Sequence, residues 1–268
     1  MYRLKLGISV AICEETAEQK LRTMKELGFD SADIGLCGYR KEPEKERELI
    51  LNAGKSLELV KSLGLFLNGI HVPFGHNWDF SSADEEKRQL AMNNFKNMLA
   101  VTDLYGPHCY VIHGSFEPIP VELREAQIVA LQRSLSEMVM LTQTPIAVES
   151  LPRTCLFNTA KEGISIVDAV EGVRVCADVN HFLQEDSVDA VLALGSRIIT
   201  THISDHDYIN EQHWMPGEGK IDWMRMLAAL EKIGYDGVFN YELGNDPTEI
   251  KKNYDKLFAE YNAMALHT

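Results

Sequence analysis

The sequence predicts an α/β protein, a closed (β/α)8 or TIM barrel that forms one domain over residues 1–268. Three observations support this prediction. Short apolar runs of strand length alternate about eight times with amphipathic stretches of helical period, and strands that alternate with helices form parallel sheets. Many of the amphipathic stretches end in glycine, which commonly terminates helices. The length of 268 residues is also close to the roughly 250 residues of one closed eightfold barrel.

The first strand and helix show the pattern that recurs along the chain. Lys5–Val10 is apolar enough for a buried strand, Ala17, Leu21 and Met24 recur at helical spacing, and Gly28 ends the helix. No Gly-x-Gly-x-x-Gly motif follows this strand, which weakens the alternative of an open, doubly wound sheet. The later strands are predicted at Ala32–Leu36, Leu65–Val72, His108–His113, Ile146–Glu149, Val173–Asp178, Arg197–His202 and Gly237–Leu243. The helices after them are predicted at 49–63, 84–105, 121–141, 159–170, 187–194, 221–233 and 248–261.

Composition and charge restrict the partners. Hydrophobic residues make up 45% of the chain and charged residues 25%, the balance of a globular protein with a sizeable core. The formal net charge of -14 predicts a surface that repels phosphate backbones and anionic membranes, so neither nucleic acid nor a membrane is expected as a partner. We find no signal-peptide pattern in residues 1–10 and expect a cytoplasmic protein. The five cysteines form no Cys-x-x-Cys pair, and we expect reduced, mostly buried thiols.

Polar side chains end six consecutive predicted strands. In a (β/α)8 barrel the carboxyl ends of the strands face a common pocket, so these side chains are candidate site residues. Each residue alone is weak evidence for a site, because such residues also occur at the solvated ends of ordinary strands. Together they would form a buried ring of carboxylates and imidazoles that is costly without a cation, which predicts a metal site. The six residues are His71, His113, Glu149, Asp178, His202 and Glu242.

The order of these residues resembles the xylose isomerase-like barrel superfamily over nearly the whole chain. Two further motifs carry the resemblance, Asp178-x-x-His181 and the segment 217–223, Gly-Glu-Gly-Lys-Ile-Asp-Trp. The superfamily includes sugar epimerases, hydroxypyruvate and inosose isomerases, a dehydroshikimate dehydratase and the endonuclease IV family. The resemblance to its epimerase and isomerase branch implies one divalent metal ion held by Glu149, Asp178, His202 and Glu242. It also implies that Glu149 and Glu242 act on the substrate.

Three carboxylates and one imidazole suit Mn²⁺, Mg²⁺ or Co²⁺ and do not exclude Zn²⁺. Such an ion stabilises the enediolate that forms when the carbon next to a carbonyl loses its proton. One of Glu149 and Glu242 would remove this proton, and the other would return it to the opposite face or to the neighbouring carbon. We therefore predict an isomerase or epimerase of a small polyhydroxylated substrate, namely a sugar, a keto-acid or an inosose. A metal-dependent lyase of the dehydroshikimate dehydratase type shares the first step and is one alternative.

A zinc phosphoesterase like endonuclease IV is the second alternative. His71, His113 and the pair Glu211-x-His213 match the positions that complete a three-zinc cluster in that family, except that Glu211 stands where the family has aspartate. These four residues leave open whether further metal ions bind. The net charge of -14 argues against a DNA-binding enzyme, because phosphate contacts require clustered Lys and Arg.

In the isomerase interpretation, histidines around the metal site bind the substrate. His71 and His113 would bind substrate hydroxyls, and His213 would lie on a lid in the segment 205–219, the longest without periodicity. His181 would bind a substrate oxygen or, equally, support Asp178. We also expect a homo-oligomer.

Cations and aromatic rings near the predicted strand ends are further candidates. Lys220, Arg40 and Arg153 could bind a carboxylate or phosphate, although solvated cations are more common. Residues 202–211 contain no arginine, whereas ketohexose epimerases that the chain resembles usually have one shortly after the histidine of strand seven. Three aromatic residues in predicted loops could stack on a sugar or simply pack there: Trp78, Phe116 and Trp214.

Overall fold

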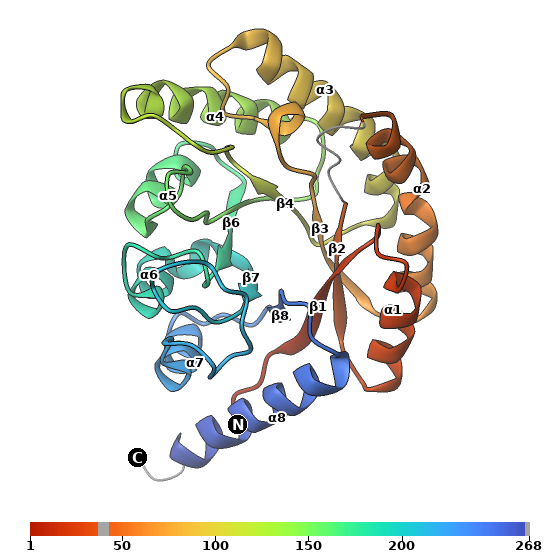
Figure 1. Cartoon of the computed structure of the whole chain (residues 1–268), viewed down its shortest axis with the longest axis vertical. Coiled ribbons are helices and arrows are strands. Elements are labelled where there is room, and N and C mark those ends of the chain that lie inside the picture. The colour runs from red at the N-terminus through yellow and green to blue at the C-terminus, as the bar shows by residue number, and fades with distance from the viewer. Residues whose placement is uncertain (37–42, 266–268) are drawn as a thin grey trace.

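Eight parallel strands close into a barrel in the computed structural model, which describes residues 1–36 and 43–265 (Figure 1). Each strand pairs with its neighbours in the sequence, and β8 pairs with β1 to close the sheet. The strands are β1 (Lys5–Ala11), β2 (Ser31–Gly35), β3 (Phe66–His71), β4 (Cys109–His113), β5 (Ile146–Glu149), β6 (Val173–Asp178), β7 (Ile198–Ile203) and β8 (Val238–Tyr241). The prediction of a single closed (β/α)8 barrel is confirmed.

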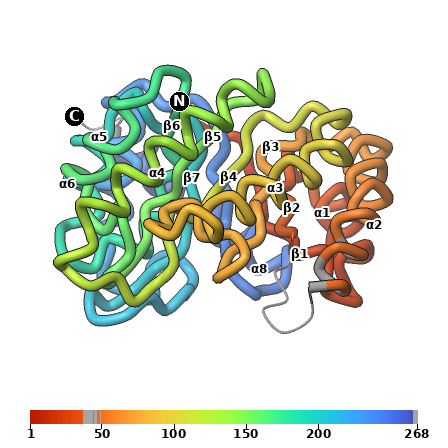
Figure 2. Tube along the Cα trace, turned by 90° about the horizontal axis from the view of Figure 1, so that it is seen from above, coloured from red at the N-terminus to blue at the C-terminus, as the bar shows by residue number. Residues whose placement is uncertain are grey.

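Helices surround the strands on all sides, with α5 and α6 at one end of the molecule and α1 and α2 at the other (Figure 2). They are α1 (Ala17–Glu26), α2 (Pro43–Ser62), α3 (Glu85–Thr102), α4 (Arg124–Met138), α5 (Ala160–Val167), α6 (Ser187–Leu194), α7 (Trp223–Lys232) and α8 (Pro247–Ala265). No helix among residues 1–36 and 43–265 is long and apolar enough to cross a membrane.

Local sequence explains where several helices begin and end. The side chain of Asp84 accepts hydrogen bonds from the amides of Glu86 and Lys87, which caps α3, and Asp186 caps α6 in the same way. Gly28 follows α1 with φ of 79°, a left-handed conformation that glycine adopts without strain. The first residues of the chain lie beside α8, where the amide of Tyr2 donates to Asn262 Oδ1 at 2.8 Å (Figure 1).

The apolar core lies mainly between the strands and the helices. Along β4, Tyr110 and Ile112 pack in this large core, whereas Cys109, Val111 and His113 alternate with them and face the barrel interior. The interior is small and polar in places, because further buried side chains there carry polar groups: Ser31, Asp33, Asn68, Thr200, His202 and Asn240. A group of buried polar side chains therefore lies inside the barrel beneath the strand ends.

The cysteines differ from the expectation of reduced thiols in one respect. Cys109, Cys155 and Cys176 are free and buried, as expected. Cys13, which is exposed after β1, is disulfide-bonded, so the expectation is wrong for this residue. Cys37 lies outside the described residues.

Candidate active site

The four residues of the predicted metal set meet at the carboxyl ends of the strands. Glu149 ends β5, Asp178 ends β6, His202 lies in β7 and Glu242 follows β8. One donor atom from each lies within 4.8 Å of the others. His202 Nδ1 is at the centre, 3.1 Å from Glu149 Oε1 and 2.9 Å from Glu242 Oε2. Because parallel strands bring their carboxyl ends to one mouth, side chains distant in sequence converge here.

This donor set fits a divalent cation. Asp178 is fully buried, and its Oδ1 accepts a hydrogen bond from the amide of Asn180 at 2.8 Å. Its Oδ2 makes no hydrogen bond among the described residues, although His181 Nδ1 lies 3.1 Å away. A buried carboxylate oxygen without a donor is costly, and a bound cation would compensate it. Burial raises the pKa of Asp178 to about 7.

The two glutamates of the set are held ionised by their neighbours. Burial by itself raises the pKa of Glu149, but His113, His202 and His71 together lower it well below its ordinary value. Burial also raises the pKa of Glu242, but His202 outweighs this effect and lowers the pKa to about 2. Both carboxylates are therefore ionised at neutral pH and able to accept a proton.

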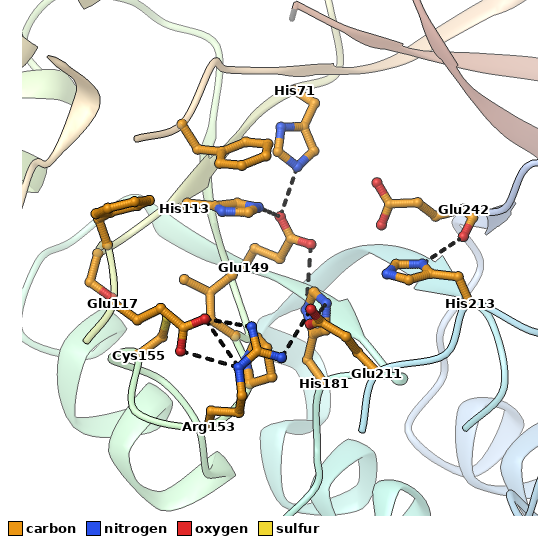
Figure 3. A pocket seen from close by; sticks show the side chains of 15 residues that line it. His71, His113, Glu117, Glu149, Arg153, Cys155, His181, Glu211, His213 and Glu242 are labelled. Carbon is orange, nitrogen blue, oxygen red and sulfur yellow. Dashed lines mark hydrogen bonds and ion pairs between the residues drawn. The ribbon is translucent and has the colours of Figure 1, made fainter. Parts of the chain in front are cut away.

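His71 and His113 both contact Glu149. Figure 3 shows the two rings on one side of this carboxylate, with His71 Nε2 3.0 Å and His113 Nε2 3.1 Å from its Oε2. His71 Nδ1 also lies 3.0 Å from the carbonyl oxygen of Val72. Burial lowers the pKa of His71, but Glu149 raises it more, to about 9, so a charged ring can donate from both nitrogens. These three residues also form a second group of potential metal ligands.

His181 lies on the other side of the site and forms a third such group with Glu211 and His213. Its Nδ1 lies 2.8 Å from the carbonyl oxygen of Ser150, and its Nε2 lies 3.3 Å from Glu211 Oε2. Burial opposes a raised pKa of His181, but Asp178 and other acidic neighbours raise it to about 10. His181 thus contacts both Asp178 and the cavity residue Glu211. Its two predicted roles, binding a substrate oxygen or supporting Asp178, stay predictions.

Arg153 lines the cavity, but its guanidinium group is already paired. Nη1 lies 2.9 Å from Glu211 Oε1, and Nε donates to Glu117 Oε1 at 3.1 Å (Figure 3). The residue has φ of 54°, an uncommon conformation for a side chain with a Cβ atom. Glu117 was not recognised from the sequence, because it lies four residues beyond His113 in an aperiodic loop.

The site opens into a cavity of about 290 Å³ (Figure 3). The cavity contains both catalytic candidates and four of the five predicted substrate-binding residues. It is lined by His71, Phe74, His113, Ser115, Phe116, Glu117, Glu149, Leu151, Pro152, Arg153, Cys155, His181, Glu211, His213 and Glu242.

The aromatic candidates have different positions. Phe116 lines the cavity, whereas Trp78 is buried near Phe80 in the core. Trp214 is exposed and forms an isolated antiparallel β-bridge with Asp205. Phe74, which the sequence did not single out, stacks on the ring of His113 with centroids 4.5 Å apart. The sequence signal that could have identified Phe74 is the Pro-Phe pair shortly after a strand that ends in histidine.

Lys220 is the predicted substrate-binding residue that the structure does not bring to the cavity. Its side chain is exposed, and its amide donates to the carbonyl oxygen of His206 at 2.8 Å, which holds the backbone against the loop after β7. Arg40 lies outside the described residues.

The motif itself is explained by Asp205, a fully buried carboxylate just after β7. It accepts hydrogen bonds from the amides of Gly217, Gly219 and Ile221 and from Trp223 Nε1, at 2.8 to 3.1 Å. A Cβ atom on Gly219 would lie 2.3 Å from Asp205 Oδ1, so only glycine fits. These bonds close the loop that carries Glu211 and His213.

Comparisons with known proteins agree with this fold. The model of the xylose isomerase-like TIM-barrel family matches residues 21–260, and the chain belongs to this family. A D-psicose 3-epimerase of Enterocloster bolteae is 26% identical over 226 residues, which cover 79% of this chain and 71% of that protein. An inosose isomerase of Bacillus subtilis is 27% identical over 201 residues, 68% of each chain.

Solved structures show the same fold. A D-tagatose 3-epimerase-like protein superimposes with a TM-score of 0.82 and 22% identity, covering 98% of this chain and 100% of that chain. An L-ribulose 3-epimerase gives a TM-score of 0.77 and 17% identity, covering 99% and 96%.

Proposed function

We propose that the chain is a divalent-metal-dependent epimerase or isomerase of a sugar or a related polyhydroxylated carbonyl compound. The observation that carries the proposal is the pair of ionised carboxylates, Glu149 and Glu242, that reach one cavity from β5 and from the end of β8 around a shared imidazole. The relatives named D-psicose 3-epimerase and inosose isomerase support it, since both names describe rearrangement beside a carbonyl.

The metal ion in this proposal is held by Glu149, Asp178, His202 and Glu242, and we propose one ion per chain. Bound there, a divalent cation supplies Lewis acidity that stabilises negative charge developing on a substrate oxygen. The identity of the ion stays among Mn²⁺, Mg²⁺, Co²⁺ and Zn²⁺, because the set combines three oxygen ligands with one nitrogen.

The protein's own residues move the proton. One of Glu149 and Glu242 takes the proton from the carbon beside the carbonyl, and the other delivers a proton to the product. His71 and His113 hold Glu149 Oε2 by contacts of 3.0 and 3.1 Å, which fix the orientation of this carboxylate. Its Oε1 faces His202.

Other cavity residues position the substrate. His181 and His213 present ring nitrogens beside Glu211, where they can hydrogen-bond substrate oxygens. Phe74 and Phe116 supply apolar surface that excludes water from the ionised groups. Lys220 has no part in this proposal.

Exchange of substrate hydrogen with solvent tests the proposal. Purified protein with Mn²⁺ or Co²⁺ is incubated in D₂O with ketoses, hydroxypyruvate and inososes, and deuterium incorporation is followed by NMR and mass spectrometry. We expect incorporation into at least one compound and its loss in Glu149→Gln and Glu242→Gln. Glu117→Gln, which changes a cavity carboxylate paired with Arg153 and outside the proposed metal set, is the control that retains exchange.

The product and the metal content separate the other outcomes. A dehydrated product would establish a lyase instead of an isomerase. Nearly three equivalents of zinc by elemental mass spectrometry, without exchange into any compound, would contradict the proposal.

A further inference from the structure

A fourth buried carboxylate lies beneath the site and has no part in the proposed proton transfer. Asp33 of β2 is 1% exposed and faces the barrel interior below His202. Its Oδ2 accepts a hydrogen bond from Asn68 Nδ2 at 3.2 Å, and its Oδ1 has no hydrogen-bond partner among the described residues. One hydrogen bond is little compensation for a buried carboxylate.

The nearest imidazole to this carboxylate also has an unsatisfied atom. His202 Nε2 lies 3.6 Å from Asp33 Oδ2 and makes no hydrogen bond within residues 1–36 and 43–265. The distance is longer than a hydrogen bond. An approach of about half an ångström would give the buried His202 Nε2 a hydrogen-bond partner and the buried Asp33 carboxylate a second donor, at Oδ2.

The other nitrogen of His202 faces the metal set. Nδ1 lies 2.9 Å from Glu242 Oε2 and 3.1 Å from Glu149 Oε1. A neutral imidazole carries one proton, so a ring that gives its Nδ1 lone pair to a metal must carry the proton on Nε2. That proton points toward Asp33.

Three strands make room for Asp33 and connect it to His202. A Cβ atom on Gly69 of β3 would lie 2.6 Å from Asp33 Oδ1, so a larger residue there would displace the carboxylate. The register between β2 and β3 shifts at Ala32 and Asp33. Asn68 Nδ2 also donates to Thr200 Oγ1 at 2.8 Å, two residues before His202 on β7.

We propose that Asp33 is a positioning residue that accepts a hydrogen bond from His202 Nε2 and thereby directs the Nδ1 lone pair to the metal ion. Carboxylates in this position orient the ring and increase its basicity, which strengthens metal binding. The proposal rests on the metal site of the proposed function. Asp33 touches neither substrate nor metal.

The first test compares metal affinity in the wild type and Asp33→Asn, using Mn²⁺ and Zn²⁺ in isothermal titration calorimetry on the full chain. We expect binding to Asp33→Asn to be roughly 10- to 100-fold weaker. The matched control is Asp103→Asn, since Asp103 accepts hydrogen bonds from Thr142 and Thr144 outside the barrel mouth. The control should lose stability without losing metal affinity. Equal affinities for wild type and Asp33→Asn would overturn the proposal.

A second readout needs no variant and no metal. In protein labelled with ¹⁵N in the histidine rings, the Nε2 proton of His202 should be shifted downfield and protected from exchange. An Nε2 without a proton, or one that exchanges freely, contradicts the role of Asp33 even where Asp33→Asn does not fold. If the wild type binds neither ion, the proposed function fails. The Nε2 proton of His202 in the same protein still tests whether Asp33 accepts its hydrogen bond.

Discussion

Removing the carboxylate of Asp205 should lower both the stability and the activity of the protein. In Asp205→Ala, the amides of Gly217, Gly219 and Ile221 and the indole N–H of Trp223 lose their acceptor. These donors bond to a carboxyl group that is 0% exposed, so water does not replace it freely.

The magnitude follows from these contacts. Each buried N–H that loses its acceptor costs about 1–3 kcal/mol, and these terms are not additive because the loop can relax. We therefore expect Asp205→Ala to lower the free energy of unfolding by about 3–5 kcal/mol. Asp205→Asn keeps one oxygen acceptor but turns an NH₂ group toward N–H donors, so its effect should be intermediate.

Urea unfolding followed by circular dichroism, with kcat/KM on the substrate found by exchange, measures both effects. The activity should fall because the loop closed by Asp205 carries Glu211 and His213. Asp207→Asn, in the same loop but bonded to the amides of Ile209 and Asn210 near the surface, is the control with the smaller effect. An Asp205→Ala protein with unchanged midpoint and activity would refute this account of the loop.

Three further predictions concern the metal, the barrel interior and pH. Chelation should abolish turnover and a divalent ion should restore it; full activity in metal-free protein contradicts the site. Gly69→Ala should lower the free energy of unfolding by about 1–3 kcal/mol, because its Cβ atom overlaps Asp33, and an unchanged Tm would oppose this. The pKa of Glu211 is lowered from 4.5 to about 2, mainly by its hydrogen bond with His181. The ionised Glu211 therefore stabilises the folded protein above pH 4.5, and this stabilisation is lost as the pH falls toward 2. Glu211→Gln should therefore lose less stability between pH 7 and pH 3 than the wild type, and equal losses would count against the pair.

The fold was predictable because its signals are local. The period of apolar residues and the glycines at helix ends each depend on a few neighbouring residues, and eight repeats of one unit leave few other topologies. Some predicted ends match the structure and others differ by up to six residues. For example, α2 begins at Pro43 instead of residue 49, and α7 begins at Trp223 instead of Ile221, since Asp222 caps it. Capping geometry decides such boundaries, and periodicity alone does not.

The convergence of the strand-end residues was also predictable, because a parallel barrel brings all carboxyl ends to one mouth. Their partners were not. Asp33 lies within a strand next to no motif, and its relation to His202 depends on the register of β2 against β3 and on the curvature of the sheet. Lys220, by contrast, is exposed and does not line the cavity.

The polar interior explains how one barrel can support such a site. Asp33, Asn68 and Thr200 beneath the site cost burial energy that their few hydrogen bonds only partly offset. The barrel tolerates this cost because its large apolar core lies outside the strands, where the helices pack. Stability and chemistry thus depend on opposite faces of the same strands: Ile112 belongs to the outer core, and the next residue, His113, contacts Glu149. Truncation of His113 should therefore change metal binding or activity more than stability, and truncation of Ile112 should do the reverse.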